Sequence, residues 1–379
     1  MRRTQLLAIL WVSFSVCLGT PSVASRASDG DPWADLEEEI RALGIDPDTV
    51  VIPGRLNAEM KAWVHEKISP NVSPDVVLRQ LLAELIDPHG FKLIYDPGFT
   101  GTAEEVWNTR RANCLGFTHL FVGLTRELGL STFYVRWSMI QRFRREGDLV
   151  LVSGHVSAGW GVAGKRQVLE FGAVDGFEGH LSQPISDRNA LARHYANRSA
   201  ESLRSGNFGE AVTAADLSTR LEPNLADGWV NLGVARRRSG DMAGAEDAYR
   251  RATRVDPDHL PAYQNLSVLM NLQGAEDAAR RVMSLLDRRD NRNPFTYLAL
   301  GDNSLDLGRF DEAARFYERA HQLEPRLAET RAARGLVALA LGDSQKAEKW
   351  LRRAQAIDSE EARTLELTDK LSRTDDPSK

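Results

Sequence analysis

The chain has 379 residues, which is enough for two or three domains of ordinary size. With 42% apolar and 27% charged residues, it is not a wholly disordered, collagen-like or multi-span membrane protein. The net charge of −5 gives no basic field for nucleic acid, so we expect no nucleic-acid partner. Two cysteines, Cys17 and Cys114, are too few for a disulfide-rich scaffold or a multi-cysteine zinc site.

The first residues have the pattern of a secretory signal peptide. Arg2 and Arg3 give a positive start, an apolar run continues to Leu18, and small residues precede a cleavage position after Ala24. The apolar run is too short for a typical membrane span. The pattern therefore predicts a signal peptide over residues 1–24 and an exported, periplasmic protein.

Cleavage there would leave Cys114 as the lone cysteine of the mature chain, a candidate reactive thiol. Two alternatives stay open: an uncleaved anchor, and a membrane-anchored lipoprotein attached through Cys17. The large Val16 is a poor match to a lipidation signal. For the processed protein, we expect membrane association only if Cys17 is lipidated.

An acidic lead-in over residues 25–56 precedes a first domain that we expect at 57–185. Its opening segments, 56–68 and 73–87, read as amphipathic helices, and Ser73 is a suitable N-cap for the second. The segment "FKLIYD" that follows is a short strand candidate.

Cys114 opens a stretch with helical periodicity that runs to Leu128 and stops at Gly129. Asn113 is a suitable N-cap, so Cys114 is expected at a helix N-terminus. The partial positive charge at that end favours the thiolate, which is the nucleophilic form of the side chain.

Three strand candidates follow, at residues 131–140, 148–162 and 166–174. His155 lies inside the second of them. Antiparallel pairing with the third strand would bring a carboxylate alongside His155, where it could orient the imidazole.

A cysteine at a helix start, a histidine on a later strand and a carboxylate on the next strand resemble the transglutaminase-like superfamily, over roughly residues 75–180. That superfamily shares its Cys-His-Asp arrangement with papain-like proteases. The resemblance implies an α+β fold, Cys114 as nucleophile and His155 as general base and acid. It also implies acyl transfer at amides, by peptide cleavage, deamidation or cross-linking.

The third member of the triad has two candidates. A loose loop over residues 161–164 would pair His155 with Glu170, whereas a tight turn at Gly164–Lys165 would place it near Asp175. Glu170 stands close to the family's usual aspartate position. We expect no cofactor and no metal, because the chain has no phosphate loop, no HExxH motif and no metal-ligand spacing of its histidines.

The C-terminal half repeats with a period of 34 residues. Glycine recurs at Gly206, Gly240, Gly274, Gly308 and Gly342, and alanine recurs at Ala211, Ala245, Ala279, Ala313 and Ala347. Aromatic residues open four units, at Tyr195, Trp229, Tyr263 and Tyr297, and Arg331 takes that position in the fifth. Proline closes three units, at Pro223, Pro257 and Pro325.

This pattern resembles the tetratricopeptide repeat (TPR), in which each unit is a pair of antiparallel helices. We expect five units over residues 192–359, and a capping helix and tail over 360–379. The resemblance implies a curved stack whose groove binds a protein or peptide partner.

The predicted fold class is therefore an α+β transglutaminase/papain-like domain followed by an all-α TPR solenoid. The leading hypothesis is an exported thiol acyl-transfer domain coupled to a protein-binding module. The alternative is a catalytically inactive domain that acts with the repeats as an envelope scaffold or adaptor.

Overall fold

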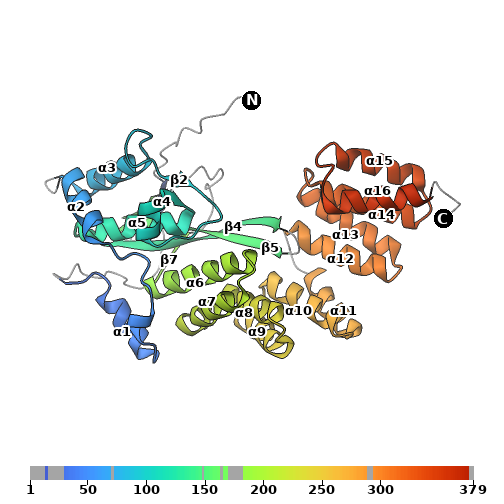
Figure 1. Ribbon diagram of the computed structural model, residues 1–379, viewed down its shortest axis with the longest axis horizontal. Helices are drawn as coiled ribbons and strands as arrows, with labels where there is room; N and C mark the ends of the chain where they lie inside the picture. Colours follow the sequence, from blue (N-terminus) through green and yellow to red (C-terminus); the bar gives the residue numbers. More distant parts are fainter. Residues whose placement is uncertain are drawn as a thin grey trace. The chain divides into compact units, whose positions relative to one another are not determined.

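The computed structural model describes residues 13–15, 30–69, 72–146, 149–162, 165–169, 182–287 and 293–374. The chain divides into two compact units (Figure 1). The first comprises residues 1–142 and 153–262, and the second comprises 143–152 and 263–379. Among the described helices, none combines the length and apolarity of a membrane span.

The first unit begins with a group of helices built around a central one. In chain order they are α1 (Ala34–Ala42), the short 3-10 helix η1 (Pro47–Thr49), α2 (Ala58–Lys67), α3 (Pro74–Ile86), α4 (Ala103–Thr109) and α5 (Cys114–Glu127). Helix α5 is buried on all sides from Leu115 to Thr125. A helix that is apolar nearly all round has no solvent face, which explains its central position in the core.

The five-stranded sheet has the order β1-β6-β5-β4-β7. Its strands are β1 (Ser13–Ser15), β4 (Thr132–Glu146), β5 (Leu149–Val162), β6 (Lys165–Leu169) and β7 (Ser182–Ile185). The three strands predicted after the cysteine helix are thus present. The predicted strand "FKLIYD" is reduced to β2 (Ile94–Tyr95), which pairs in parallel with β3 (Arg111–Ala112).

The two faces of the main sheet carry separate apolar clusters. On one face Tyr134, Val156 and Ala158 join the core that contains α5. The other face carries a smaller cluster of Phe133, Val135, Trp137 and Val168. Because side chains alternate along a strand, the odd-numbered residues in the middle of β5 belong to the second face. The hydrogen bond from the Trp137 indole to the Ser157 hydroxyl, at 2.7 Å, agrees with this assignment.

The pairing of β5 with β6 differs from the pairing that either predicted hairpin connection would produce. Val162 pairs with Lys165, and Ala158 pairs with Leu169. A tight turn at Gly164–Lys165 is wrong because Lys165 is already in the ladder. A loose loop over 161–164 is wrong because Val162 is also paired. Only two residues separate the last paired positions, the shortest common hairpin connection.

Two helical pairs complete the first unit: α6 (Asp187–Arg204) with α7 (Phe208–Leu221), and α8 (Ala226–Arg238) with α9 (Met242–Val255). The second unit contains most of α10 (Leu260–Leu272), then α11 (Glu276–Asp287), α12 (Pro294–Asp306), α13 (Phe310–Leu323), α14 (Ala328–Ala340), α15 (Ser344–Gln355) and α16 (Ala362–Thr374). Leu367 and Leu371 pack α16 onto the last repeat.

The 34-residue period has a direct structural cause. All five repeating glycines have positive φ, between 68° and 88°, at the turn between the two helices of a unit. Glycine enters this left-handed region without the steric cost that a Cβ imposes. The five repeating alanines are fully buried, where a small side chain lets the helices approach closely.

A further row of small residues, which the sequence reading missed, has the same period: Ser199, Gly233, Ser267, Gly301 and Gly335. At Gly233 and Gly301 an added Cβ would collide with the rings of Tyr249 and Tyr317. Where serine stands instead, its hydroxyl donates to the carbonyl of the buried alanine twelve residues later, as in Ser199 to Ala211 at 2.8 Å. A small residue at this position therefore leaves room for a neighbouring ring at Gly233 and Gly301 and bonds a backbone carbonyl at Ser199 and Ser267.

Candidate functional site

Cys114 is the first residue of α5, as the sequence predicts, and it is a half-buried free thiol. Asn113 caps the helix in an extended conformation, and its Oδ1 accepts from the Gly116 backbone N–H at 2.9 Å. Helix starts leave unpaired N–H groups that attract negative charge. The Cys114 side chain therefore lies at the N-terminal end of α5, next to these N–H groups.

His155 is buried on β5, with 5% of its surface exposed. The residue after it, Val156, contacts α5 through its backbone: the Thr118 hydroxyl donates to the Val156 carbonyl at 3.4 Å. Strand alternation, however, assigns the His155 side chain to the face of Ser157, away from α5.

Glu170 and Asp175, the two candidates for the third member of the triad, lie outside the described residues. Cys17, the candidate lipidation site, also lies outside them. In the described segments, no group of three or more His, Cys, Asp or Glu side chains is placed to hold a metal ion.

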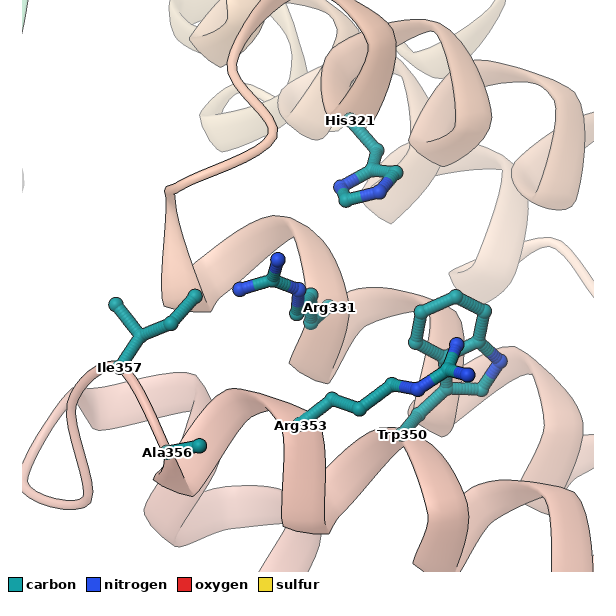
Figure 2. A pocket seen from close by; sticks show the side chains of 6 residues that line it. All are labelled: His321, Arg331, Trp350, Arg353, Ala356 and Ile357. Atoms are coloured by element: carbon teal, nitrogen blue, oxygen red, sulfur yellow. The ribbon is translucent and has the colours of Figure 1, made fainter.

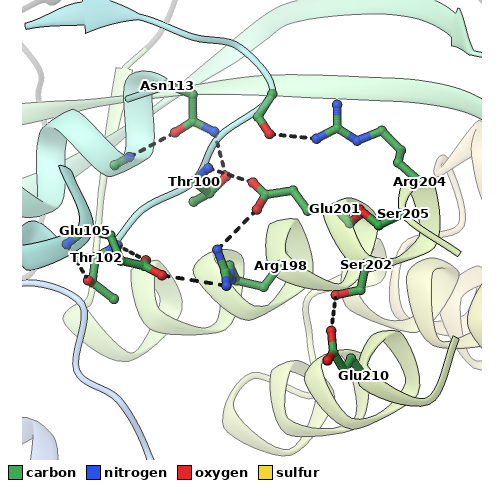
Figure 3. A network of polar contacts seen from close by, with 12 residues as sticks. Thr100, Thr102, Glu105, Asn113, Arg198, Glu201, Ser202, Arg204, Ser205 and Glu210 are labelled. Atoms are coloured by element: carbon green, nitrogen blue, oxygen red, sulfur yellow. Dashed lines mark hydrogen bonds and ion pairs between the residues drawn. The ribbon is translucent and has the colours of Figure 1, made fainter. Parts of the chain in front are cut away.

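A polar network holds the start of α5 from below (Figure 3). The Asn113 amide donates to the Thr100 hydroxyl at 2.6 Å, and the Thr100 backbone N–H donates to Glu201 Oε1 at 2.6 Å. Thr100 and Asn113 are both buried. Glu201 lies on α6, so the cap of the cysteine helix is connected to the first repeat helix through two hydrogen bonds.

Arginines on α6 extend this network. Arg198 pairs with Glu201 at 3.4 Å and with Glu105 at 3.7 Å, and Arg204 donates to the Gly98 carbonyl at 2.7 Å. Burial raises the pKa of Glu201, while the hydrogen bonds from Thr100 and the charges of Arg198 and Arg204 act in the opposite direction. The loop before α4 is thus fastened to α6 by a mixed-charge cluster.

Helix α6 also has an anchor at its N-terminus. Arg126, at the end of α5, makes a bidentate pair with Asp187 at 2.6 and 2.8 Å. The same guanidinium donates twice to the Thr132 carbonyl, at 3.2 and 2.9 Å, and lies 4.6 Å from the centre of the Trp33 ring. One side chain therefore joins α1, α5, β4 and α6.

Two buried histidines meet where the cysteine helix packs on the first repeat helix: His119 lies on α5 and His194 lies on α6. His119 Nδ1 is 2.9 Å from the Tyr134 hydroxyl, and the His119 and His194 rings meet edge to face at 5.2 Å. Burial lowers the pKa of His119 well below its usual range and that of His194 to about 3. Both rings are therefore neutral at physiological pH, which suits a packing role.

Sequence reasoning could have found part of this site. The capping box of α4, in which Thr102 and Glu105 satisfy each other's backbone N–H groups, is a four-residue motif that is visible in the sequence. Glu201 had no such signal, because it lies 101 residues from Thr100. The contact arises only from the tertiary fold.

Models of the tetratricopeptide repeat family match residues 201–259, 294–327 and 328–361. No curated protein sequence matches the chain.

Solved structures also resemble the helical half. One is YrrB, a TPR protein with an unusual peptide-binding site (16% identity, 47% of this chain, 92% of that chain, TM-score 0.36). A second is PilF of Pseudomonas aeruginosa (18% identity, 49% of this chain, 85% of that chain, TM-score 0.44). A third is a MamA protein (19% identity, 48% of this chain, 94% of that chain, TM-score 0.35). These likenesses are weak, so the assignment rests on the family models together with the helix pairs. Residues 201–259 and 294–361 are tetratricopeptide repeats, and this part of the chain is a protein-binding module.

Proposed function

We propose that the protein is a binding adaptor, in which the repeats hold a protein or peptide partner and the preceding α+β part is a folded support. The helix pairs that match the tetratricopeptide repeat models, at residues 201–259 and 294–361, are the observation that carries this proposal. The fusion of α6 into the first unit through Glu201 and Arg126 supports it, because the support and the first repeat then form one compact body. The placement of His155 on the sheet face away from α5 also favours binding over catalysis.

A capture experiment tests the adaptor. The wild-type protein and a Cys114→Ala variant would be used to isolate partners from an envelope extract. We expect both to capture the same partner in equal amounts, because no step of binding requires the thiol. A Gly301→Leu variant, whose side chain would collide with the Tyr317 ring, should lose that partner. Dependence of capture on Cys114 would contradict the adaptor.

A second candidate is thiol acyl transfer by a transglutaminase-like domain. The position of the half-buried Cys114 at the start of α5 favours it. In this proposal the Cys114 thiolate attacks an amide carbonyl, the amine leaves with a proton delivered by His155, and a thioester forms. Water or a second amine then releases the acyl group. Glu170 or Asp175 would orient His155.

Acyl transfer makes a distinct prediction. A glutamine peptide incubated with the protein should release ammonia and leave a mass adduct on Cys114, and both signals should vanish in Cys114→Ala and fall steeply in His155→Ala. If peptides that bind to the repeats give neither ammonia release nor a Cys114 adduct, acyl transfer is contradicted and the adaptor function is the one that stays.

We further propose export directed by residues 1–24. Removal of that segment would take β1 with it and leave β6 as the edge of the main sheet. Mass spectrometry of the mature N-terminus tests the proposal. We expect Ser25 as the first residue, whereas a lipidated Cys17 would show the membrane-anchored form, and an intact Met1 would contradict processing.

A further inference from the structure

The last repeat contains a pocket of ≈ 350 Å³ that lies wholly within the second unit. Helices α13, α14 and α15 and the turn after α15 form its walls (Figure 2). The lining residues are His321, Arg331, Trp350, Arg353, Ala356 and Ile357. It is a mixed site with cationic, aromatic and aliphatic groups on facing walls.

The repeat pattern explains why the pocket is there. Arg331 occupies the position at which the other four units carry an aromatic residue. In two of those units the arginine 22 residues later lies over that ring: Arg251 over Trp229 at 5.6 Å, and Arg319 over Tyr297 at 5.9 Å. The equivalent arginine of the last unit is Arg353, and it has no ring at position 331 to cover. The last repeat therefore lacks the arginine–ring contact that these two repeats have at the same position.

The charges around the opening are not balanced. Arg334 is paired with Glu318 at 2.7 Å, but among the described residues neither Arg331 nor Arg353 has an ion-pair partner. The Trp350 ring lies under two guanidinium groups, with Arg334 at 3.9 Å and Arg353 at 4.9 Å from its centre. Burial and the nearby arginines lower the pKa of His321, which agrees with a cationic surrounding.

We propose that this pocket binds a carboxylate of an acidic peptide, held between Arg331 and Arg353, with a neighbouring apolar side chain packed on Trp350 and Ile357. Guanidinium groups bind carboxylates through paired, charge-assisted hydrogen bonds. The exposed Ile357 and the half-buried Trp350, which both line the pocket, supply the apolar contact that a small ion would not use. The volume is at the lower end of ligand pockets, which suits one or two side chains.

This inference rests on the proposed peptide binding and says where in the repeats one contact is made. The carboxylate can belong to a Glu or Asp side chain or to a peptide C-terminus. Three probe peptides separate these sources: acetyl-Gly-Leu-Glu-Leu-Gly-amide, the same peptide with Gln for Glu, and acetyl-Gly-Leu-Gln-Leu with a free C-terminus.

The test is a titration of the full-length protein with each probe, followed by calorimetry and by the indole N–H resonance of Trp350. We expect a carboxylate probe to bind at least tenfold more tightly than the Gln-amide peptide, to shift the Trp350 resonance, and to weaken with added salt. The variant Arg331→Tyr restores the aromatic residue of the other units, so it should fold and lose the binding. Arg353→Gln should weaken binding at least fivefold, and Arg251→Gln, its counterpart in the second repeat, should not.

Two results would overturn the pocket. One is that neither the Glu peptide nor the peptide with a free C-terminus binds more tightly than the Gln-amide peptide. The other is carboxylate binding that Arg331→Tyr leaves intact, which would place peptide binding elsewhere on the repeats. The proposed function is tested separately by partner capture. If the protein captures its partner but the pocket binds no carboxylate probe, this inference is refuted and the proposed function is not.

Discussion

At the scale of single residues, the core of the first unit depends on two histidines that stay neutral. His119 and His194 are buried against each other and against Tyr134, and both have lowered pKa values. In the unfolded chain both would take up a proton near pH 6.5. Acid therefore favours unfolding, because only the unfolded state binds these protons.

The lowered pKa values predict that the free energy of unfolding decreases as the pH falls. The contribution of His194 is fully present above pH 6.5 and is lost as the pH falls towards its folded value of about 3. In that window the free energy of unfolding should fall by about 1.4 kcal/mol per pH unit for each buried histidine. Urea denaturation of wild type and His194→Gln at several pH values measures it. The variant should have the shallower slope, and His89→Gln, at an exposed site, should match wild type.

The cap of the cysteine helix gives a second prediction. Glu201→Gln keeps the shape of the side chain but removes the charge that pairs with Arg198 and accepts from Thr100. We expect a loss of under about 1 kcal/mol in unfolding free energy, because a charge-assisted hydrogen bond becomes a neutral one while burial, which raises the pKa of Glu201, no longer acts on a charge. Alkylation of Cys114 by iodoacetamide should also become faster as α5 frays at its start. The exposed Glu210→Gln is the control, and an equal effect there would refute the role of Glu201.

At the scale of elements, the repeats were predictable because their signal is local and repeated. Each glycine indicates a left-handed turn, and each buried alanine indicates a place where two helices cross closely. Because the pattern occurs five times, each copy supports the assignment of the others. The helix from Cys114 was predictable for a similar reason, since Asn113 and the leucine spacing are close in sequence. The β5–β6 register was not, because one residue of slip changes every pairing and the turn residues allow more than one hairpin.

Helix packing within a repeat can be tested at Gly301. Adding a Cβ there would force the buried Tyr317 ring to move, so Gly301→Ala should cost about 1–3 kcal/mol of unfolding free energy. Gly209→Ala has open space around the new methyl group and lies in α7, so it should be neutral or slightly stabilising. Thermal unfolding of both variants decides this. An equal loss in both variants would mean that contact with the Tyr317 ring does not set the cost at Gly301.

At the scale of the whole molecule, the boundary between the α+β part and the repeats is not a linker. Helix α6 starts at Asp187 and is tied to the first unit at both ends, by Arg126 and by Arg204. The sequence could indicate where the repeat pattern begins but not this attachment, because Arg126 and Asp187 are 61 residues apart. Their pairing depends on the complete fold.

This attachment predicts a large cost for a single change. Arg126→Met leaves the Thr132 carbonyl and Asp187 without their partner, and we expect a loss of about 3 kcal/mol. Arg188→Met, on the same helix, breaks only long and partly exposed pairs and should cost under about 1 kcal/mol. Equilibrium unfolding in urea compares them. Similar values for both would show that α6 is not held through Arg126.

The central claim is that the chain binds partners without using Cys114 and His155 as a catalytic pair. The most direct test is the rate of Cys114 alkylation by iodoacetamide between pH 5 and pH 9, in wild type and in His155→Ala. We expect the two pH profiles to coincide, because strand alternation assigns the His155 side chain to the sheet face away from α5. A fast reaction below pH 7 that His155→Ala abolishes would contradict it and establish a thiolate–imidazolium pair.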